Sequence, residues 1–99
     1  LNEIKNDFLD KRIFVFTPKG DVVDLPGGST AIDFAYAIHT DLGNTMSGVE
    51  INNKLSNLST PLKNGDIVKI VTKKNGKPNR KWLDFAKTSL AKRQIKNLS

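Results

Sequence analysis

The fold is decided by Ser29-Thr-Ala-Ile-Asp-Phe-Ala-Tyr-Ala-Ile-His-Thr-Asp-Leu-Gly43, a stretch whose apolar residues recur at helical spacing. Thr30 can cap this helix and place Asp33 in its first turn, where a carboxylate faces free amide groups and the positive helix end. Gly43 stands where a glycine commonly ends a helix. We therefore expect one helix with a single apolar stripe made of Ala31, Phe34, Ala35, Ile38 and Leu42.

Strand-like segments flank this helix on both sides. Residues 12–17 and 22–25 are rich in β-branched and aromatic residues and are separated by the turn Pro18-Lys-Gly-Asp21, which predicts a hairpin. After the helix, strands are expected at 46–51, 54–58 and 67–72, with turns at Asn52-Asn53 and at 62–66. The order β-β-α-β-β-β indicates an α+β fold, a β-grasp (ubiquitin-like) sheet packed on one helix.

Helices are also expected near the C-terminal end. Asn79 can cap a short helix that carries Trp82, and Thr88 or Ser89 can cap a second one, whose stripe is Leu90, Ala91, Gln94, Ile95 and Leu98. So small a sheet does not bury both Trp82 and this stripe, so we expect part of that surface to face a neighbouring domain. The expected division is 1–11, the tail of an upstream segment; 12–72, the β-grasp domain; 73–78, a basic linker; and 79–99, the start of a downstream helical segment.

Composition excludes several kinds of chemistry. The 99 residues suffice for one domain, and the chain reads as a piece of a longer protein because it starts at Leu1 and stops in a charged run. It has no cysteine, which excludes disulfides, thiolate catalysis and cysteine-based zinc sites and fits the cytoplasm. Its one histidine, His39, excludes any cluster that needs two imidazoles, and no cofactor or metal is expected. No segment is long and apolar enough for a membrane span.

Charge is divided unequally along the chain. The net charge of +6 combines −4 for residues 1–50 with +10 for residues 51–99. A basic half favours a polyanionic partner, nucleic acid first, although a solvated lysine-rich surface explains the same pattern. Trp82 and Phe85 lie within the basic run, so they either stack on RNA bases or belong to the core. The cations of that run are Lys73, Lys74, Lys77, Arg80, Lys81, Lys87, Lys92, Arg93 and Lys96.

His39 is the one residue with catalytic character. On the expected helix it lies on a ridge with Ile32 and Tyr36, at the border of the apolar stripe. A partly exposed histidine there can stack on a base or donate to a ribose or phosphate, whereas a border histidine can equally well only pack. The sequence shows no orienting carboxylate and nucleophile, so a general base is not expected.

Several stretches closely resemble the TGS domain, a module shared by threonyl-tRNA synthetases, certain GTPases and RelA/SpoT stringent-response enzymes. They are Val15-Phe-Thr-Pro-Lys-Gly-Asp21, Leu25-Pro-Gly-Gly-Ser-Thr30, Asp33-Phe-Ala-Tyr-Ala-Ile-His-Thr40 and Leu62-Lys-Asn-Gly-Asp-Ile-Val-Lys-Ile70. The tail Trp82-Leu-Asp-Phe-Ala-Lys-Thr-Ser89, followed by Ala91-Lys-Arg-Gln-Ile95, is similar to the segment after TGS in RelA/SpoT homologues.

The resemblance implies a non-catalytic regulatory domain of a (p)ppGpp synthetase/hydrolase. It implies contact with the 3′ CCA end of deacylated tRNA on the ribosome, in which His39 takes part. The RNA-binding site that we predict consists of His39, Tyr36, Thr40 and Lys19. In some relatives the domain instead binds acyl carrier protein, and docking to the enzyme's own catalytic half is a further alternative. Family members commonly carry Arg or His where Ala37 stands, and some carry Arg where Thr45 stands. These two departures leave open the alternative that the domain binds a protein partner.

Overall fold

The computed structural model describes residues 12–98, so the expected upstream tail, residues 1–11, lies outside the described residues. Two strands come first, β1 (Arg12–Phe16) and β2 (Val22–Pro26), followed by the helices α2 (Ala31–Ile38) and α3 (Thr40–Asn44). The strands β3 (Met46–Ile51), β4 (Lys54–Ser56) and β5 (Val68–Thr72) follow, and the chain continues into the 3-10 helix η1 (Arg80–Asp84) and the helix α4 (Ser89–Leu98).

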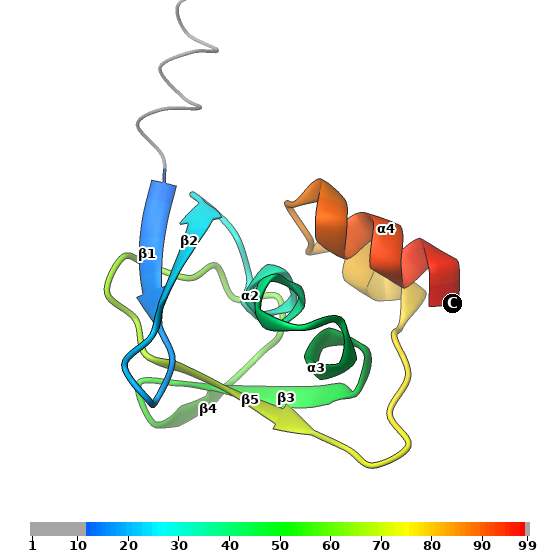
Figure 1. The fold of residues 1–99 in the computed structure, drawn as a ribbon, viewed down its shortest axis with the longest axis horizontal. Coiled ribbons are helices and arrows are strands. Elements are labelled where there is room, and N and C mark those ends of the chain that lie inside the picture. Colours follow the sequence, from blue (N-terminus) through cyan, green and yellow to red (C-terminus); the bar gives the residue numbers. More distant parts are fainter. Residues whose placement is uncertain (1–11, 99) are drawn as a thin grey trace, which may run out of the picture.

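The strands form two antiparallel sheets that together make the expected β-grasp. β1 and β2 make an antiparallel hairpin, and β3 lies between β4 and β5, antiparallel to both. A parallel bridge between Phe16 and Ile67 joins the two sets, and the Phe16 N–H donates to the Asp66 carbonyl at 2.8 Å. β1 therefore lies beside the segment that leads into β5 (Figure 1). The fourth strand ends at Ser56, two residues before the predicted end at Leu58.

The helix α2 is covered on two sides, which the single apolar stripe did not predict. Figure 1 shows α2 between the strands and the C-terminal helices. Every residue from Ala31 to Tyr36 is buried, whereas Ile38, a member of the predicted stripe, is exposed. A helix with neighbours on both sides buries its whole circumference, so the one-stripe prediction is wrong for this helix.

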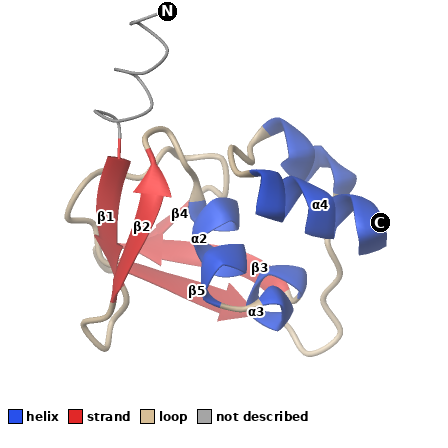
Figure 2. Ribbon diagram, turned by 45° about the horizontal axis from the view of Figure 1, so that its top comes forward, coloured by secondary structure: helices blue, strands red, loops and turns tan. Residues whose placement is uncertain are grey.

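The helix α4 packs against α2, α3 and η1 rather than against the sheet (Figure 2). Trp82 is 7% exposed and Ile95 is fully buried, in one core cluster with Phe34 and Val49. Of the later stripe, Ala91 and Ile95 are buried whereas Leu90 is 43% exposed, so the stripe is buried only in part, and against α2 rather than against the sheet. Trp82 and Phe85, which is half-buried, belong to the core and do not form a stacking platform for RNA bases.

A buried carboxylate joins these two parts of the fold. Asp33 occupies the predicted place in the first turn of α2 and accepts from the Thr30 N–H at 3.0 Å, which completes a capping box. It also accepts from the Lys87 N–H, the Thr88 N–H and the Thr88 hydroxyl, all at 2.9–3.0 Å. Asp33 therefore ties the start of α2 to the residues that precede α4.

Candidate nucleic-acid interface

The helix expected over 31–42 is broken at His39. This residue has an extended backbone (φ −162°, ψ 140°) and is at once the C-cap of α2 and the N-cap of α3. Its N–H donates to the Ala35 carbonyl at 3.1 Å, which closes the last turn of α2. The predictions of one continuous helix ended by Gly43, and of a helical ridge shared by Ile32, Tyr36 and His39, are therefore wrong.

A close contact between Tyr36 and Gly43 accompanies the break. The tyrosine ring lies over the glycine, where a Cβ atom would come within 2.4 Å of Tyr36 Cδ1. The Tyr36 hydroxyl donates to Asn44 Oδ1 at 2.9 Å, so the same side chain holds α3 at a second point. The sequence predicted Gly43 as the residue that ends the helix. In the structure Gly43 lies within α3, and its lack of a side chain leaves room for the Tyr36 ring.

The break presents the His39 ring to solvent in a defined orientation. The side chain is 68% exposed, and Nδ1 accepts from the Asp41 N–H at 3.0 Å. Because Nδ1 is the acceptor, the neutral ring carries its proton on Nε2, which can donate to a ligand. The Asp41 carboxylate lies 3.9 Å from Nδ1. A ring held this way offers both a stacking face and a hydrogen-bond donor.

A groove of about 400 Å³ lies next to the break. Its apolar wall comes from the helices, with Ile38 immediately before His39, and its opposite walls come from the β1–β2 turn and from β5. Lys19 and Lys69 line it and supply positive charge at its rim. The full lining is Thr17, Pro18, Lys19, Asp21, Phe34, Ile38, Leu42, Val68, Lys69 and Ile70.

The four predicted RNA-binding residues occupy different environments. His39 and Thr40 lie together at the helix break, and Lys19 lies across the groove in the β1–β2 turn. Tyr36 is 3% exposed, so its ring is not available for stacking on a base. Asp41, whose N–H donates to the His39 ring and orients it, was not predicted from the sequence. It could have been found from its spacing, because the side chain of an N-cap residue commonly accepts from the amide two residues further on.

Burial raises the pKa of Tyr36 from 10.0 to about 12. The unfolded chain therefore loses the phenolic proton first as the pH rises, and we expect the free energy of unfolding to fall by roughly 1–3 kcal/mol between about pH 10 and pH 12. Tyr36 is the only tyrosine, so tyrosinate absorbance reports this group alone. The variant Tyr36→Phe should lack this part of the alkaline destabilisation. A wild-type absorbance midpoint near pH 10 would contradict the prediction.

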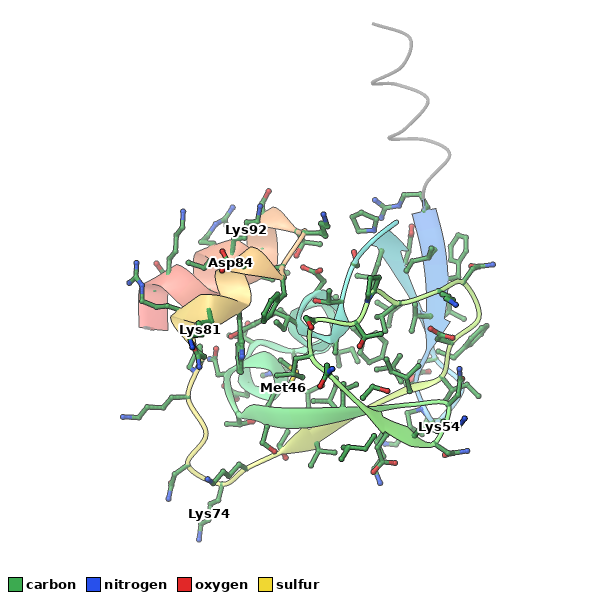
Figure 3. All side chains as sticks on the ribbon, turned by 180° about the vertical axis from the view of Figure 1, so that it is seen from behind. Met46, Lys54, Lys74, Lys81, Asp84 and Lys92 are labelled. Carbon is green, nitrogen blue, oxygen red and sulfur yellow. The ribbon has the colours of Figure 1, made fainter. Side chains whose placement is uncertain are left out.

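The C-terminal segment carries an exposed basic surface. Lys74, Lys81 and Lys92 lie on the linker, η1 and α4 respectively (Figure 3), and all three are exposed. Asp84 is the only acidic residue between positions 67 and 98. Such a surface attracts polyanions in general, because phosphates and carboxylates both complement it.

The groove and the helix break lie within residues matched by a known family. The family model described as "TGS domain" matches residues 13–72. The chain belongs to the TGS domain family. In the part of this TGS domain that the structure describes, no helix combines the length and apolar character required to cross a membrane.

Relatives match the TGS domain and the C-terminal helices together. A guanosine-3′,5′-bis(diphosphate) 3′-pyrophosphohydrolase of Haemophilus influenzae is 46% identical over 97 residues, which are 98% of this chain and 14% of that protein. A GTP pyrophosphokinase of Myxococcus xanthus is 47% identical over 96 residues, 97% of this chain and 13% of that protein. The bifunctional (p)ppGpp synthase/hydrolase SpoT of Escherichia coli is 41% identical over 98 residues, 99% of this chain and 14% of that protein. The chain thus spans about 14% of the length of these RelA/SpoT-type relatives.

Proposed function

We propose that this TGS domain is a non-catalytic regulatory part of a (p)ppGpp synthetase/hydrolase and binds the 3′ CCA end of deacylated tRNA. The observation that carries the proposal is the exposed His39 ring, which is oriented by the Asp41 amide beside a groove lined by Lys19. The names of the relatives support the choice of parent enzyme.

The chemistry of the site suits an unpaired RNA end. The His39 face can stack on a base, Nε2 can donate to a ribose or phosphate oxygen, and Lys19 can pair with a phosphate. An aminoacyl group on the terminal ribose adds bulk that would no longer fit beside the groove. Occupancy then biases the upstream catalytic domains only if the free tRNA end binds one of their states more tightly than the other.

The replacement His39→Asn should weaken binding of deacylated tRNA by roughly 1–3 kcal/mol, the range for losing a side chain that stacks on a base. Asparagine keeps an oxygen that can cap α3, whereas His39→Ala also removes the cap and should cost about 0.5–2 kcal/mol of stability. The measurement compares the Kd of both variants and the wild type for deacylated tRNA, aminoacylated tRNA and tRNA without its CCA end.

Two results would contradict the proposal. One is a folded His39→Asn variant with wild-type affinity for deacylated tRNA. The other is a wild-type domain that binds equally well to tRNA with and without the CCA end, since general attraction to phosphates then explains all of the binding.

A second candidate function is docking to an acidic protein, either acyl carrier protein or a surface of the enzyme's own catalytic half. The exposed basic surface on the linker, η1 and α4 supports it, because the positive charge of that surface complements carboxylates. That surface does not include His39, so the two functions depend on different residues. Adding acyl carrier protein to the same titration separates the two. Binding to the carrier protein that His39→Asn does not alter, together with no CCA-dependent binding of tRNA, would favour protein docking.

A further inference from the structure

We infer that Tyr36 and Gly43 form a positioning pair, in which the close contact of ring and glycine sets the backbone and side-chain geometry of His39. The inference rests on the proposed function in that His39 is taken as the residue that meets the RNA. It assigns to Tyr36 a different role from the RNA contact predicted from the sequence, because its ring is buried and cannot itself reach a base.

The helix α3 is held against α2 by contacts that converge on its C-terminal half. The Tyr36 ring covers Gly43, and the Tyr36 hydroxyl donates to Asn44. The following residue, Thr45, donates through its N–H and its hydroxyl to the Asp41 carbonyl, at 3.1 and 2.7 Å. The linker closes over this point, since the Lys73 N–H donates to the Thr45 carbonyl at 2.8 Å. A helix of five residues has no stability of its own, so these contacts determine where α3 lies.

The position of α3 in turn determines the geometry of His39. His39 is the only residue between the two helices, so its extended backbone must absorb the whole change of direction. Its ring is held by the Asp41 amide, which belongs to the first turn of α3. If α3 moves away from Tyr36, the backbone angles of His39 and the bond from the Asp41 N–H to Nδ1 both change. The pair therefore acts on RNA binding through His39 rather than by contact with the RNA.

Two variants perturb the pair from opposite sides. Gly43→Ala places a methyl group within 2.4 Å of the ring, and Tyr36→Leu removes the ring from the glycine. Each has a matched control. Gly48→Ala adds the same methyl group where the nearest atom that it would meet is Val71 Cβ at 3.9 Å. Tyr36→Phe keeps the ring over Gly43 and removes only the hydroxyl that donates to Asn44, so it separates the two contacts of Tyr36.

Each variant is measured by hydrogen exchange of the Asp41 amide and by its Kd for deacylated tRNA. In Gly43→Ala and Tyr36→Leu, we expect the protection of the Asp41 amide to fall by about tenfold and the tRNA affinity to fall by about fivefold or more. Adding His39→Asn to either variant should then reduce the tRNA affinity by a smaller factor than it does in the wild type, because a misplaced His39 ring contributes less to binding. Gly48→Ala should keep wild-type protection and bind within about twofold of the wild type. Tyr36→Phe loses only the bond to Asn44, so it should lose less protection and less tRNA affinity than Tyr36→Leu.

The outcomes separate the positioning role from general stability and from the proposed function. A general loss of stability would lower protection across the core but leave the full cost of His39→Asn in place, and that result would overturn the inference. Wild-type protection of the Asp41 amide in either folded variant would also overturn it, so Tyr36→Leu remains decisive if Gly43→Ala does not fold. If the wild type shows no CCA-dependent binding, the proposed function fails, while the Asp41 measurement still decides whether the pair positions His39.

Discussion

Replacing Asp33 with alanine is expected to lower the free energy of unfolding by about 3–4 kcal/mol. The carboxylate is 1% exposed and accepts hydrogen bonds from Thr30, Lys87 and Thr88. Its removal leaves several amide groups without an acceptor in a place that water does not readily reach, and each such group costs about 1–3 kcal/mol. Urea unfolding followed by the fluorescence of Trp82, the only tryptophan, measures the change.

Two companion variants show which property of Asp33 matters. Asp33→Asn keeps one acceptor oxygen but turns a donor toward the same amide groups, so a loss of about 2 kcal/mol or more is expected. Asp24→Ala removes an exposed carboxylate that pairs with Arg12 and should cost less than about 1 kcal/mol. If Asp33→Ala were no more destabilising than Asp24→Ala, Asp33 would not join α2 to the C-terminal segment.

Replacing Trp82 with alanine should lower the free energy of unfolding by about 3–5 kcal/mol, the usual range for truncating a buried tryptophan to alanine. Trp82 and Ile95 bring the C-terminal helices into the same core as Phe34 of α2, so the loss should destabilise the whole domain. Because this variant has no tryptophan, unfolding is followed by circular dichroism. Trp82→Phe should recover much of the stability, because it refills most of the volume.

Leu90→Ala is the control for that experiment. Leu90 lies in the same segment but its side chain is 43% exposed, so a change of within about 0.5 kcal/mol is expected. Equal stabilities of Trp82→Ala and the wild type would mean that packing of the C-terminal helices through Trp82 does not stabilise the domain. A large loss would instead make the C-terminal helices part of the folding unit.

Features that depend on neighbouring residues were predictable from the sequence. The hairpin turn at 18–21 contains Gly20 at φ 96°, and Asn52 and Asn53 both have positive φ in the turn between β3 and β4. The cap at Thr30 and the place of Asp33 in the first turn of α2 were also predicted correctly. These features follow from the conformational preferences and hydrogen bonds of a few adjacent side chains, so a short stretch of sequence determines them.

Which surfaces meet was decided only by the tertiary structure. The apolar spacing over residues 31–42 fits one helix, yet the structure has two helices with His39 extended between them, and the Tyr36 ring lies against Gly43. Likewise, Asp33 could be predicted as a cap but not as the acceptor for Lys87 and Thr88, which lie more than fifty residues further along the chain. In both cases the deciding contact joins groups whose distance in space is set by packing, and helical periodicity carries no information about what lies on the second side of a helix.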